Sequence, residues 1–305
     1  MSKELQARAD QGKAAAAPAR ERQSRLWKSY RRSPMAWVGT LILVALVLTA
    51  VCAPFLAPHD PQVQSLPDRL KPPAWMAGGV PQYLLGTDRM GRDVLSNLIY
   101  GVRVSLLVGF ASIFLSALIG IPLGVLAGYY RGRVDALIMR AVDAQLSLPT
   151  VLLALGIMAI WGRGLEKLIL VIGIVGWAAY ARTARASTLS VREREFVEAA
   201  RALGTSDIII MVRHVVPNII TPLVILASVE LPRVVLLEAT LSFLGVGVPL
   251  DTPSLGGMIN SGYQVLFSGR WWLSGFPGLM LMLIVFGVNL LGDWLRDALD
   301  PRLSG

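Results

Sequence analysis

The sequence is poor in charged residues. Only 16% of its 305 residues are Asp, Glu, Lys or Arg, whereas 54% are hydrophobic and the mean hydropathy is +0.58. A soluble domain of this length carries about 25% charged residues. The shortage of charge therefore excludes an ordinary soluble protein and indicates an integral membrane protein.

The residue types that build many catalytic and metal sites are also scarce. The one cysteine, Cys52, lies inside an apolar run, which excludes an intrachain disulfide and favours a packing role. The two histidines, His59 and His214, fall on opposite sides of the predicted membrane, so they cannot form a zinc site of the HExxH type. The sequence also lacks a G-x-S-x-G elbow, which the segment beginning at Gly204 approaches most nearly, and a GxxxxGK[ST] phosphate loop. We expect no enzyme activity, no metal and no cofactor, and in particular no ATP binding by this chain alone.

Positive charge is concentrated at the beginning of the chain. The net charge is +9, and nine of the 29 basic residues precede the first apolar run. They are accompanied by no base-reading motif and no basic face with interleaved aromatics, so we do not expect nucleic-acid binding. Residues 1–33 have no apolar periodicity and are predicted to be a disordered basic tail that sets the membrane topology.

Six apolar segments approach the length of about 20 residues that a hydrocarbon core about 30 Å thick requires. They cover residues 34–57, 104–130, 144–161, 168–181, 215–244 and 276–291. With the basic tail inside, basic residues concentrate in the inner segments, which predicts an N-in, C-in topology. The expected organisation is a basic tail (1–33), a first helix (34–57), an external loop (58–103), a five-helix core (104–292) with a cytoplasmic loop at 182–214, and a cytoplasmic C-terminus (293–305).

The second half of the external loop is predicted to form an amphipathic helix at the membrane surface. Asp88 with Arg92, and Arg89 with Asp93, are i,i+4 pairs that would support such a helix. Its apolar side would carry Val94, Leu95, Leu98 and Ile99. This helix either orients the next span or contacts a partner that delivers a ligand.

Small residues recur at every fourth position of the second span. This helix-packing ladder consists of Ser112, Ser116, Gly120, Gly124 and Gly128. Such residues let another helix approach closely, and van der Waals contact is what holds membrane helices together. The ladder predicts a tightly packed bundle, with the packing partner either in this chain or in another subunit.

Five ionisable residues fall at membrane depth: Arg140, Asp143, Glu230, Arg233 and Glu238. A charge at mid-bilayer costs about 2.5 to 3.5 kcal/mol on insertion scales, so it normally faces a partner or a water-filled cavity. These residues either line a polar translocation path or form internal pairs, Arg140 with Asp143 and Glu230 with Arg233, each at i,i+3.

A polar hairpin separates the fourth and fifth spans. Its first helix is rich in good helix formers and ends at Gly204, a predicted C-cap, and Thr205, Ser206 and Asp207 offer N-caps for a second helix. Ala199 and Ala200 would leave a smooth patch rimmed by Glu198 and Arg201. Such a patch suits docking into another protein's groove, although the pattern also fits a solvated surface helix.

The run 198–217 resembles the EAA loop of ABC importer permeases. Glu198, Ala199, Ala200, Gly204 and Pro217 match at the family's spacing, whereas His214 stands where Ile is usual and Val216 where Leu is usual. Residues 85–106, 139–155 and 238–257 are similar to blocks of the dipeptide, oligopeptide and nickel branch, of the kind called C permeases in dipeptide systems. The last block departs from the branch at Leu255, where Trp is frequent.

The resemblance implies an all-α fold with about six transmembrane helices, that of a type I ABC importer transmembrane domain. The first hairpin helix would be the coupling helix that docks on a separate ATPase subunit through Glu198, Ala199, Ala200, Arg201 and Gly204. Implied partners are a sister permease subunit, two ATPase subunits that bind ATP and Mg, an external substrate-binding protein and the lipid bilayer of a bacterial cytoplasmic (inner) membrane.

The resemblance also implies the cargo, which is di- or oligopeptides. Nickel chelates, glutathione or another small solute are alternatives, because selectivity in this family rests largely with the external binding protein. A self-contained secondary transporter is a different class of function, for which intramembrane charges and inverted repeats are the markers. The charges are present in this sequence, but no convincing repeat is.

Overall fold

The computed structural model describes residue 27, residues 29–249 and residues 251–299. In this part of the chain all regular secondary structure is helical. The only β-type pairing among these residues is one isolated bridge between Thr87 and Asp93. Five helical stretches are long and apolar enough to cross a membrane: Pro34–Val51 (α3), Val94–Tyr130 (α5), Leu165–Arg192 (α8), Asp207–Phe243 (which ends in α11, Val216–Phe243) and Trp272–Leu299 (α13). A sixth is the bent pair Gly132–Leu146 (α6) and Thr150–Trp161 (α7), with 88° between its halves. The predicted all-α polytopic fold with about six spans is confirmed.

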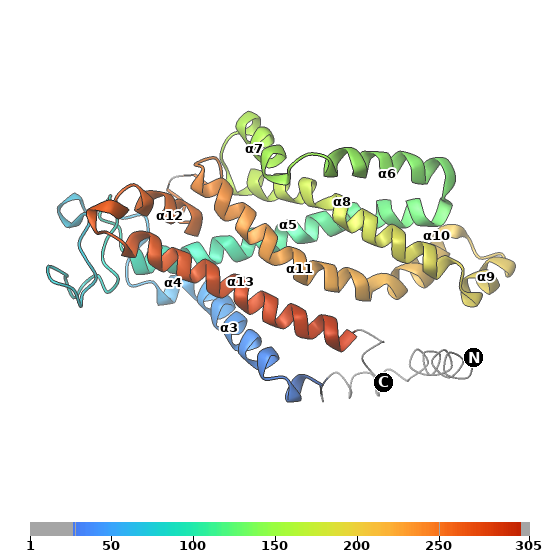
Figure 1. The fold of residues 1–305 in the computed structure, drawn as a ribbon, viewed down its shortest axis with the longest axis horizontal. Helices are drawn as coiled ribbons and strands as arrows, with labels where there is room; N and C mark the ends of the chain where they lie inside the picture. Colours follow the sequence, from blue (N-terminus) through green and yellow to red (C-terminus); the bar gives the residue numbers. More distant parts are fainter. Residues whose placement is uncertain (1–26, 28, 250, 300–305) are drawn as a thin grey trace.

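The helices form an elongated bundle with two different ends (Figure 1). At one end, here called the hairpin end, lies the short helix Glu195–Ala202 (α9) with Asp207–Ile209 (α10). The opposite end, here called the loop end, carries residues 57–93 and the short helix Leu255–Tyr263 (α12). Helix α5 runs through the bundle between the two ends and packs against α8, α11 and α3.

Local chemistry explains how the first span begins and where it packs. The Ser33 hydroxyl accepts a hydrogen bond from the Ala36 amide, and Pro34 occupies the first turn, where its missing N–H costs nothing. Gly39 lies against the backbone of α13, where a Cβ would come within 2.8 Å of the Leu290 Cβ. Helix α3 ends at Val51, before the predicted end at 57, and half-buried Cys52 separates it from the short helix Ala53–Leu56 (α4).

The surface helix expected in the external loop is not a separate element. Helix α5 begins at Val94 and continues without interruption into the second span, ten residues before the predicted start at 104. Asp93 is its N-cap, accepting from the Ser96 amide at 2.9 Å, so this aspartate ends the loop and cannot lie within a helix that begins earlier.

The two ion pairs predicted for that helix fare differently. Asp88 and Arg92 are paired at 2.7 Å, but in a turn where Asp88 also accepts from the Arg92 amide. Arg89 donates to Gln264 instead of pairing with Asp93. Of the four apolar residues in the pattern, Val94, Leu98 and Ile99 are buried and Leu95 is half-buried. An apolar helix face does not reveal whether it meets lipid or protein, and here α12 and α13 cover it.

Other predicted boundaries shift because the helices extend further. Helix α8 continues to Arg192, which leaves a hairpin shorter than the predicted 182–214. Helix α13 continues to Leu299 beyond the predicted boundary at 293, and residues 300–305 lie outside the described part. Most of the predicted tail (1–33) also lies outside it; residues 29–32 are helical.

Candidate functional site

The turn of the hairpin is made by backbone geometry at Gly204. This residue adopts φ of +76°, and the Thr205 amide donates to the Ala200 carbonyl at 3.1 Å, which is the hydrogen bond of a Schellman C-cap. Apart from its chain neighbours, no described residue lies within 4 Å of the position a Gly204 Cβ would take, so glycine is required by the left-handed backbone and not by crowding. The predicted C-cap is confirmed.

The second arm is less regular than expected. Ser206 is the N-cap of α10 by position, but its side chain makes no capping hydrogen bond. After three α-helical residues the chain forms a π-helical stretch, Ile210–Val215, before α11 begins. Such wide turns are rare and often mark functional positions. The arm therefore joins the fifth span through a local change of helical pitch.

The two alanines of the predicted patch face opposite ways. Ala199 is exposed, together with Glu198, Arg201 and Gly204, whereas Ala200 is 9% exposed and packs with Val197 in the cluster formed by α5, α8 and α11. Positions three apart lie on the same face of a helix, and on α9 Val197 and Ala200 share the face that is turned to the bundle. The prediction of a continuous exposed patch at Ala199 and Ala200 was wrong. The small side chain of Ala200 instead lets α9 lie close to the bundle.

Apolar side chains on the outer surface of the hairpin were missed by the sequence analysis. Leu203 is 85% exposed beside the turn, and Ile208 and Val212 on the second arm are also exposed. The signal was present in the sequence, since these are large apolar residues in a polar hairpin. These three exposed apolar side chains and exposed Ala199 are here called the hairpin tip; Glu198 and Arg201, on the same short helix as Ala199, are exposed as well.

Tyr129, at the end of α5, joins the hairpin to the bundle. Its hydroxyl lies 2.6 Å from the Asp207 carboxylate and 3.3 Å from the Arg201 guanidinium. Hydrogen bonding to Tyr129 raises the pKa of Arg201 above its ordinary value, so Arg201 stays charged. Nearby, Arg131 pairs with Glu193 at 2.5 Å across the start of the hairpin.

The helix-packing ladder of α5 meets α8 of the same chain. Ser112 donates to the Ile169 carbonyl and Ser116 to the Gly173 carbonyl, and both pairs are 57 residues apart. A Cβ at Gly120 would collide with the Trp177 carbonyl oxygen. At Gly124 and Gly128 the obstructing carbonyls belong to Ala181 and Arg185. Paired residue numbers rise together, so α5 and α8 run parallel, in contact over four helical turns. The partner that the sequence left undecided is therefore within this chain.

The intramembrane charges are paired in only one of the two predicted ways. Arg233 and Glu230 are 2.8 Å apart, as the i,i+3 spacing predicts. Asp143 does not pair with Arg140; it lies 2.7 Å from Arg182 of α8, and Arg140 is exposed. Asp143 pairs with Arg182 and not with Arg140 because α6 lies along α8. The acidic residues of α6 contact arginines of α8 across this interface.

Glu238 neither lines an open path nor forms an ion pair among the described residues. It is fully buried between α11 and α5, where it accepts hydrogen bonds from Ser105 at 2.8 Å and Ser242 at 2.9 Å. Two hydroxyl donors satisfy the polar atoms of a carboxyl group in an apolar interior. In this conformation Glu238 fastens two helices together.

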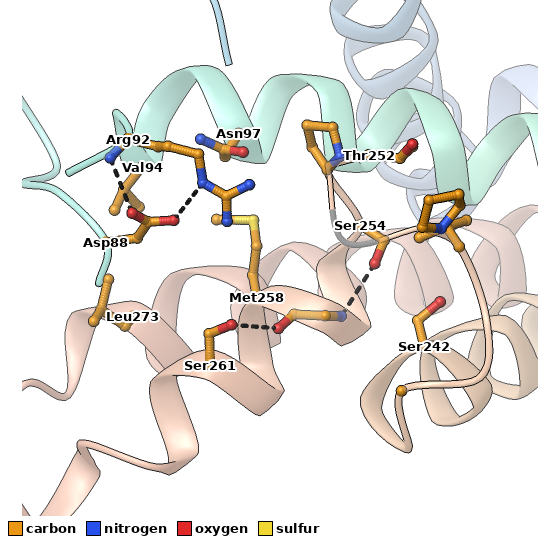
Figure 2. A pocket seen from close by; sticks show the side chains of 15 residues that line it. Asp88, Arg92, Val94, Asn97, Ser242, Thr252, Ser254, Met258, Ser261 and Leu273 are labelled. Atoms are coloured by element: carbon orange, nitrogen blue, oxygen red, sulfur yellow. Dashed lines mark hydrogen bonds and ion pairs between the residues drawn. The ribbon is translucent and has the colours of Figure 1, made fainter. Parts of the chain in front are cut away.

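A small pocket of about 70 Å³ at the loop end lies between the start of α5 and the segment that leads into α12 (Figure 2). Its wall includes Asp88, Arg92 and Asn97 on one side and Ser242, Ser254 and Met258 on the other. Arg92 and Met258 point toward one another across it, and Ser254 caps α12 by accepting from the Gly257 amide. Two sequence blocks far apart in the chain, 85–106 and 238–257, thus meet in one place.

The comparison with protein families decides the class of the molecule. Residues 120–305 match the family described as binding-protein-dependent transport system inner membrane component. The chain belongs to this family. Residues 24–73 of the permease also match the N-terminal TM domain of oligopeptide transport permease C. It is therefore a multi-pass transmembrane subunit of a binding-protein-dependent transport system.

Curated relatives cover nearly the whole permease. It is 42% identical over 278 residues to the di/tripeptide transport system permease protein DppC of Pseudomonas aeruginosa, covering 91% of each chain. It is 37% identical to the dipeptide transport system permease protein DppC of Haemophilus influenzae (91% of this chain, 94% of the relative). It is 36% identical to the glutathione transport system permease protein GsiD of Escherichia coli (92% and 90%).

A solved structure supports the same fold. An inward-facing structure of the MetNI methionine ABC transporter matches with a TM-score of 0.55 at 24% identity, over 66% of the permease and 96% of that chain. The permease therefore has the fold of a type I ABC importer transmembrane domain.

Proposed function

We propose that this permease forms half of the pore of an ATP-driven importer of di- or oligopeptides in a bacterial cytoplasmic (inner) membrane. A sister permease subunit supplies the other half, and an external substrate-binding protein delivers the peptide at the loop end. Two ATPase subunits, which bind ATP and Mg, sit at the hairpin end. The observation that carries the proposal is the hairpin tip, an apolar surface with a charged border on a segment fastened to the bundle by buried contacts.

The hairpin tip has the character of a docking surface. Leu203, Ile208 and Val212 expose apolar area that gains free energy when another protein covers it, and Glu198 and Arg201 supply a polar rim. Lipid is a poor occupant for this surface, because α9 itself is rich in charged residues and too short to span a membrane. The exposed small side chain of Ala199 allows close approach by a partner.

Docking at this position explains how ATP acts on the pore. The permease contributes no phosphate-binding loop of its own, so ATP and Mg belong to the partner subunits. ATP shifts the equilibrium between two pore states only as far as it binds one state better than the other. The hairpin is the part of the permease through which that preference reaches the spanning helices.

Peptides are the favoured cargo because two of the relatives described above are named as transporters of dipeptides or of di- and tripeptides. The relative named for glutathione makes that compound a specific alternative. Uptake by membrane vesicles that contain the complete transporter, with dipeptide, oligopeptide or glutathione as competitor, separates these cargoes.

Co-purification tests the docking proposal. The unsubstituted chain should bring down an ATPase and a second permease from gently solubilised native membranes. Leu203→Arg should remain inserted and keep the second permease but lose the ATPase, because a charge would be buried without a partner. Leu66→Arg is the matched control, since Leu66 is 68% exposed at the loop end; it should keep the ATPase. Full ATPase retention and normal ATP-dependent uptake by Leu203→Arg would contradict docking at the hairpin tip.

A further inference from the structure

Tyr129 occupies a junction between the hairpin and the spanning helices. It lies in the last turn of α5 and is 3% exposed. Its hydroxyl donates to the Asp207 carboxylate at 2.6 Å and accepts from the Arg201 guanidinium at 3.3 Å. Arg201 belongs to α9 and Asp207 begins α10, so this single hydroxyl contacts both arms of the hairpin.

The ring of Tyr129 adds a second set of contacts. The guanidinium carbons of Arg192 and Arg201 lie 5.7 Å and 5.5 Å from its centroid, within the range of a cation–π interaction. Arg192 is the last residue of α8. Within the described part of the chain, its buried Nε and Nη1 atoms have no hydrogen-bond partner, and its guanidinium carbon lies over the Tyr129 ring. The one side chain thus connects α5, α8, α9 and α10.

The hairpin is connected to the spanning helices in several ways. It follows α8 directly through residues 193–194, Val197 and Ala200 pack against the bundle, and the second arm continues into α11. The covalent route to α11 passes through the π-helical stretch Ile210–Val215, where the regular i→i+4 hydrogen bonding is lost. The contact through Tyr129 reaches α5 at the residue that follows Gly128. At Gly128 α5 and α8 are in close backbone contact. A displacement of α9 and α10 that carries Tyr129 with it would move α5 together with α8, because the two helices are in close backbone contact.

We propose that Tyr129 is a positioning residue that transmits movement of the hairpin to the α5–α8 pair during transport. The proposal rests on the proposed function of the hairpin as the ATPase docking site. Tyr129 itself touches neither ATP nor cargo. Its hydroxyl holds the two arms in one orientation relative to α5. ATP-driven movement of the arms therefore moves α5 at the same time.

The test compares two adjacent tyrosines in the complete transporter reconstituted in proteoliposomes. Tyr129→Phe removes only the buried hydroxyl. Tyr130→Phe removes the same group from the next residue, which is 46% exposed, and is the matched control. Uptake of a labelled dipeptide and ATP hydrolysis are measured together, with binding protein present, and the result is the number of peptides imported per ATP. The amount of ATPase bound to each complex is measured in parallel.

We expect Tyr129→Phe to retain the ATPase and to hydrolyse ATP. The number of peptides imported per ATP should fall by a factor of about five or more, the size of a typical coupling between two sites. Tyr130→Phe should match the unsubstituted complex. Asp207→Ala, on the exposed side of the contact, removes the acceptor of the Tyr129 hydroxyl. It should act in the same direction and provides the test if Tyr129→Phe fails to fold. The double variant should be no worse than the single ones, because all of them disrupt one contact.

Three results would overturn the inference. The first is an unchanged peptide-to-ATP ratio in Tyr129→Phe with normal uptake by the unsubstituted complex. The second is loss of bound ATPase in proportion to lost uptake, which would assign Tyr129 to holding the hairpin in shape. The third is an additive double variant. If the unsubstituted complex with bound ATPase imports no dipeptide, the proposed function itself fails, and this inference fails with it.

Discussion

The hydroxyl of Ser116 in α5 donates a hydrogen bond to the carbonyl oxygen of Gly173 in α8 at 2.9 Å. Membrane helices come this close only where side chains are small, and the hydrogen bond adds to the van der Waals contact that holds them. The contact continues through the glycines of the ladder towards Tyr129 and the hairpin. It is the structural basis for treating α5 and α8 as one body.

Filling the α5–α8 contact should destabilise the permease. In Gly124→Ala the new methyl group meets the Ala181 carbonyl, and overpacking of this kind costs about 1 to 3 kcal/mol. Gly156→Ala in α7 is the matched control, because no residue of the described ranges outside its own helical turn lies within 4 Å of its Cβ position. Thermal unfolding of the purified chain in detergent measures both variants. Equal stability of the two would show that the helices are not in backbone contact at Gly124.

Ala199 and Ala200 should respond differently to enlargement. Ala200→Leu pushes α9 away from the bundle and should destabilise the hairpin by about 1 to 3 kcal/mol, seen as faster amide hydrogen exchange over residues 195–215. Ala199→Leu adds its side chain on the exposed face and should leave that exchange unchanged. The reverse order of effects would mean that the burial of the two alanines is misassigned.

Glu238 should tolerate an amide better than an apolar side chain. Glu238→Gln retains an oxygen that accepts from Ser105 or Ser242, so we expect a small change in stability. Glu238→Leu leaves two buried hydroxyls without this partner and should cost about 1 to 3 kcal/mol. Denaturant titration of the purified permease distinguishes the variants. A loss for Gln as large as the loss for Leu would contradict a purely hydrogen-bonded role and favour a required negative charge.

Thr87 should hold the loop end in order. It is fully buried, it donates to the Asp68 carbonyl, and its hydroxyl accepts from the Lys71 amide at 2.9 Å. Thr87→Val has nearly the same shape but loses both hydrogen bonds, so exchange over residues 58–93 should accelerate by an amount equivalent to about 1 to 3 kcal/mol. Thr252→Val, at a more exposed threonine, is the control and should have little effect there. Unchanged protection of these amides from hydrogen exchange in Thr87→Val would show that Thr87 does not stabilise the loop end.

Several features were predictable because they depend on local chemistry or on the total length of apolar sequence. Gly204 ends α9 since a Schellman turn needs a left-handed residue, and the ladder in α5 packs since small residues at every fourth position lie on one face. Glu230 and Arg233 pair because they lie one turn apart on one helix. Each of these features depends on residues that lie close together in the sequence or at a fixed spacing along one helix.

Contacts between distant segments were not predictable in the same way. Asp143 pairs with Arg182 across a helix interface instead of with its neighbour Arg140. The apolar face at Val94 and Leu98 is buried by protein where the pattern suggested a membrane surface. Periodicity defines a face of a helix, but it carries no information about which surface covers that face.

The sequence by itself determined that this protein is a helical membrane permease, where its spans lie and which segment interrupts them. Only the tertiary structure decided that α8 is the partner of the ladder, that Ala200 faces inward beside exposed Ala199, and that Tyr129 joins both arms of the hairpin to α5. The physical reason is that spans follow from the free energy of transferring each segment into lipid, which is a local sum. Side-chain partners follow from how the helices pack, to which the whole chain contributes.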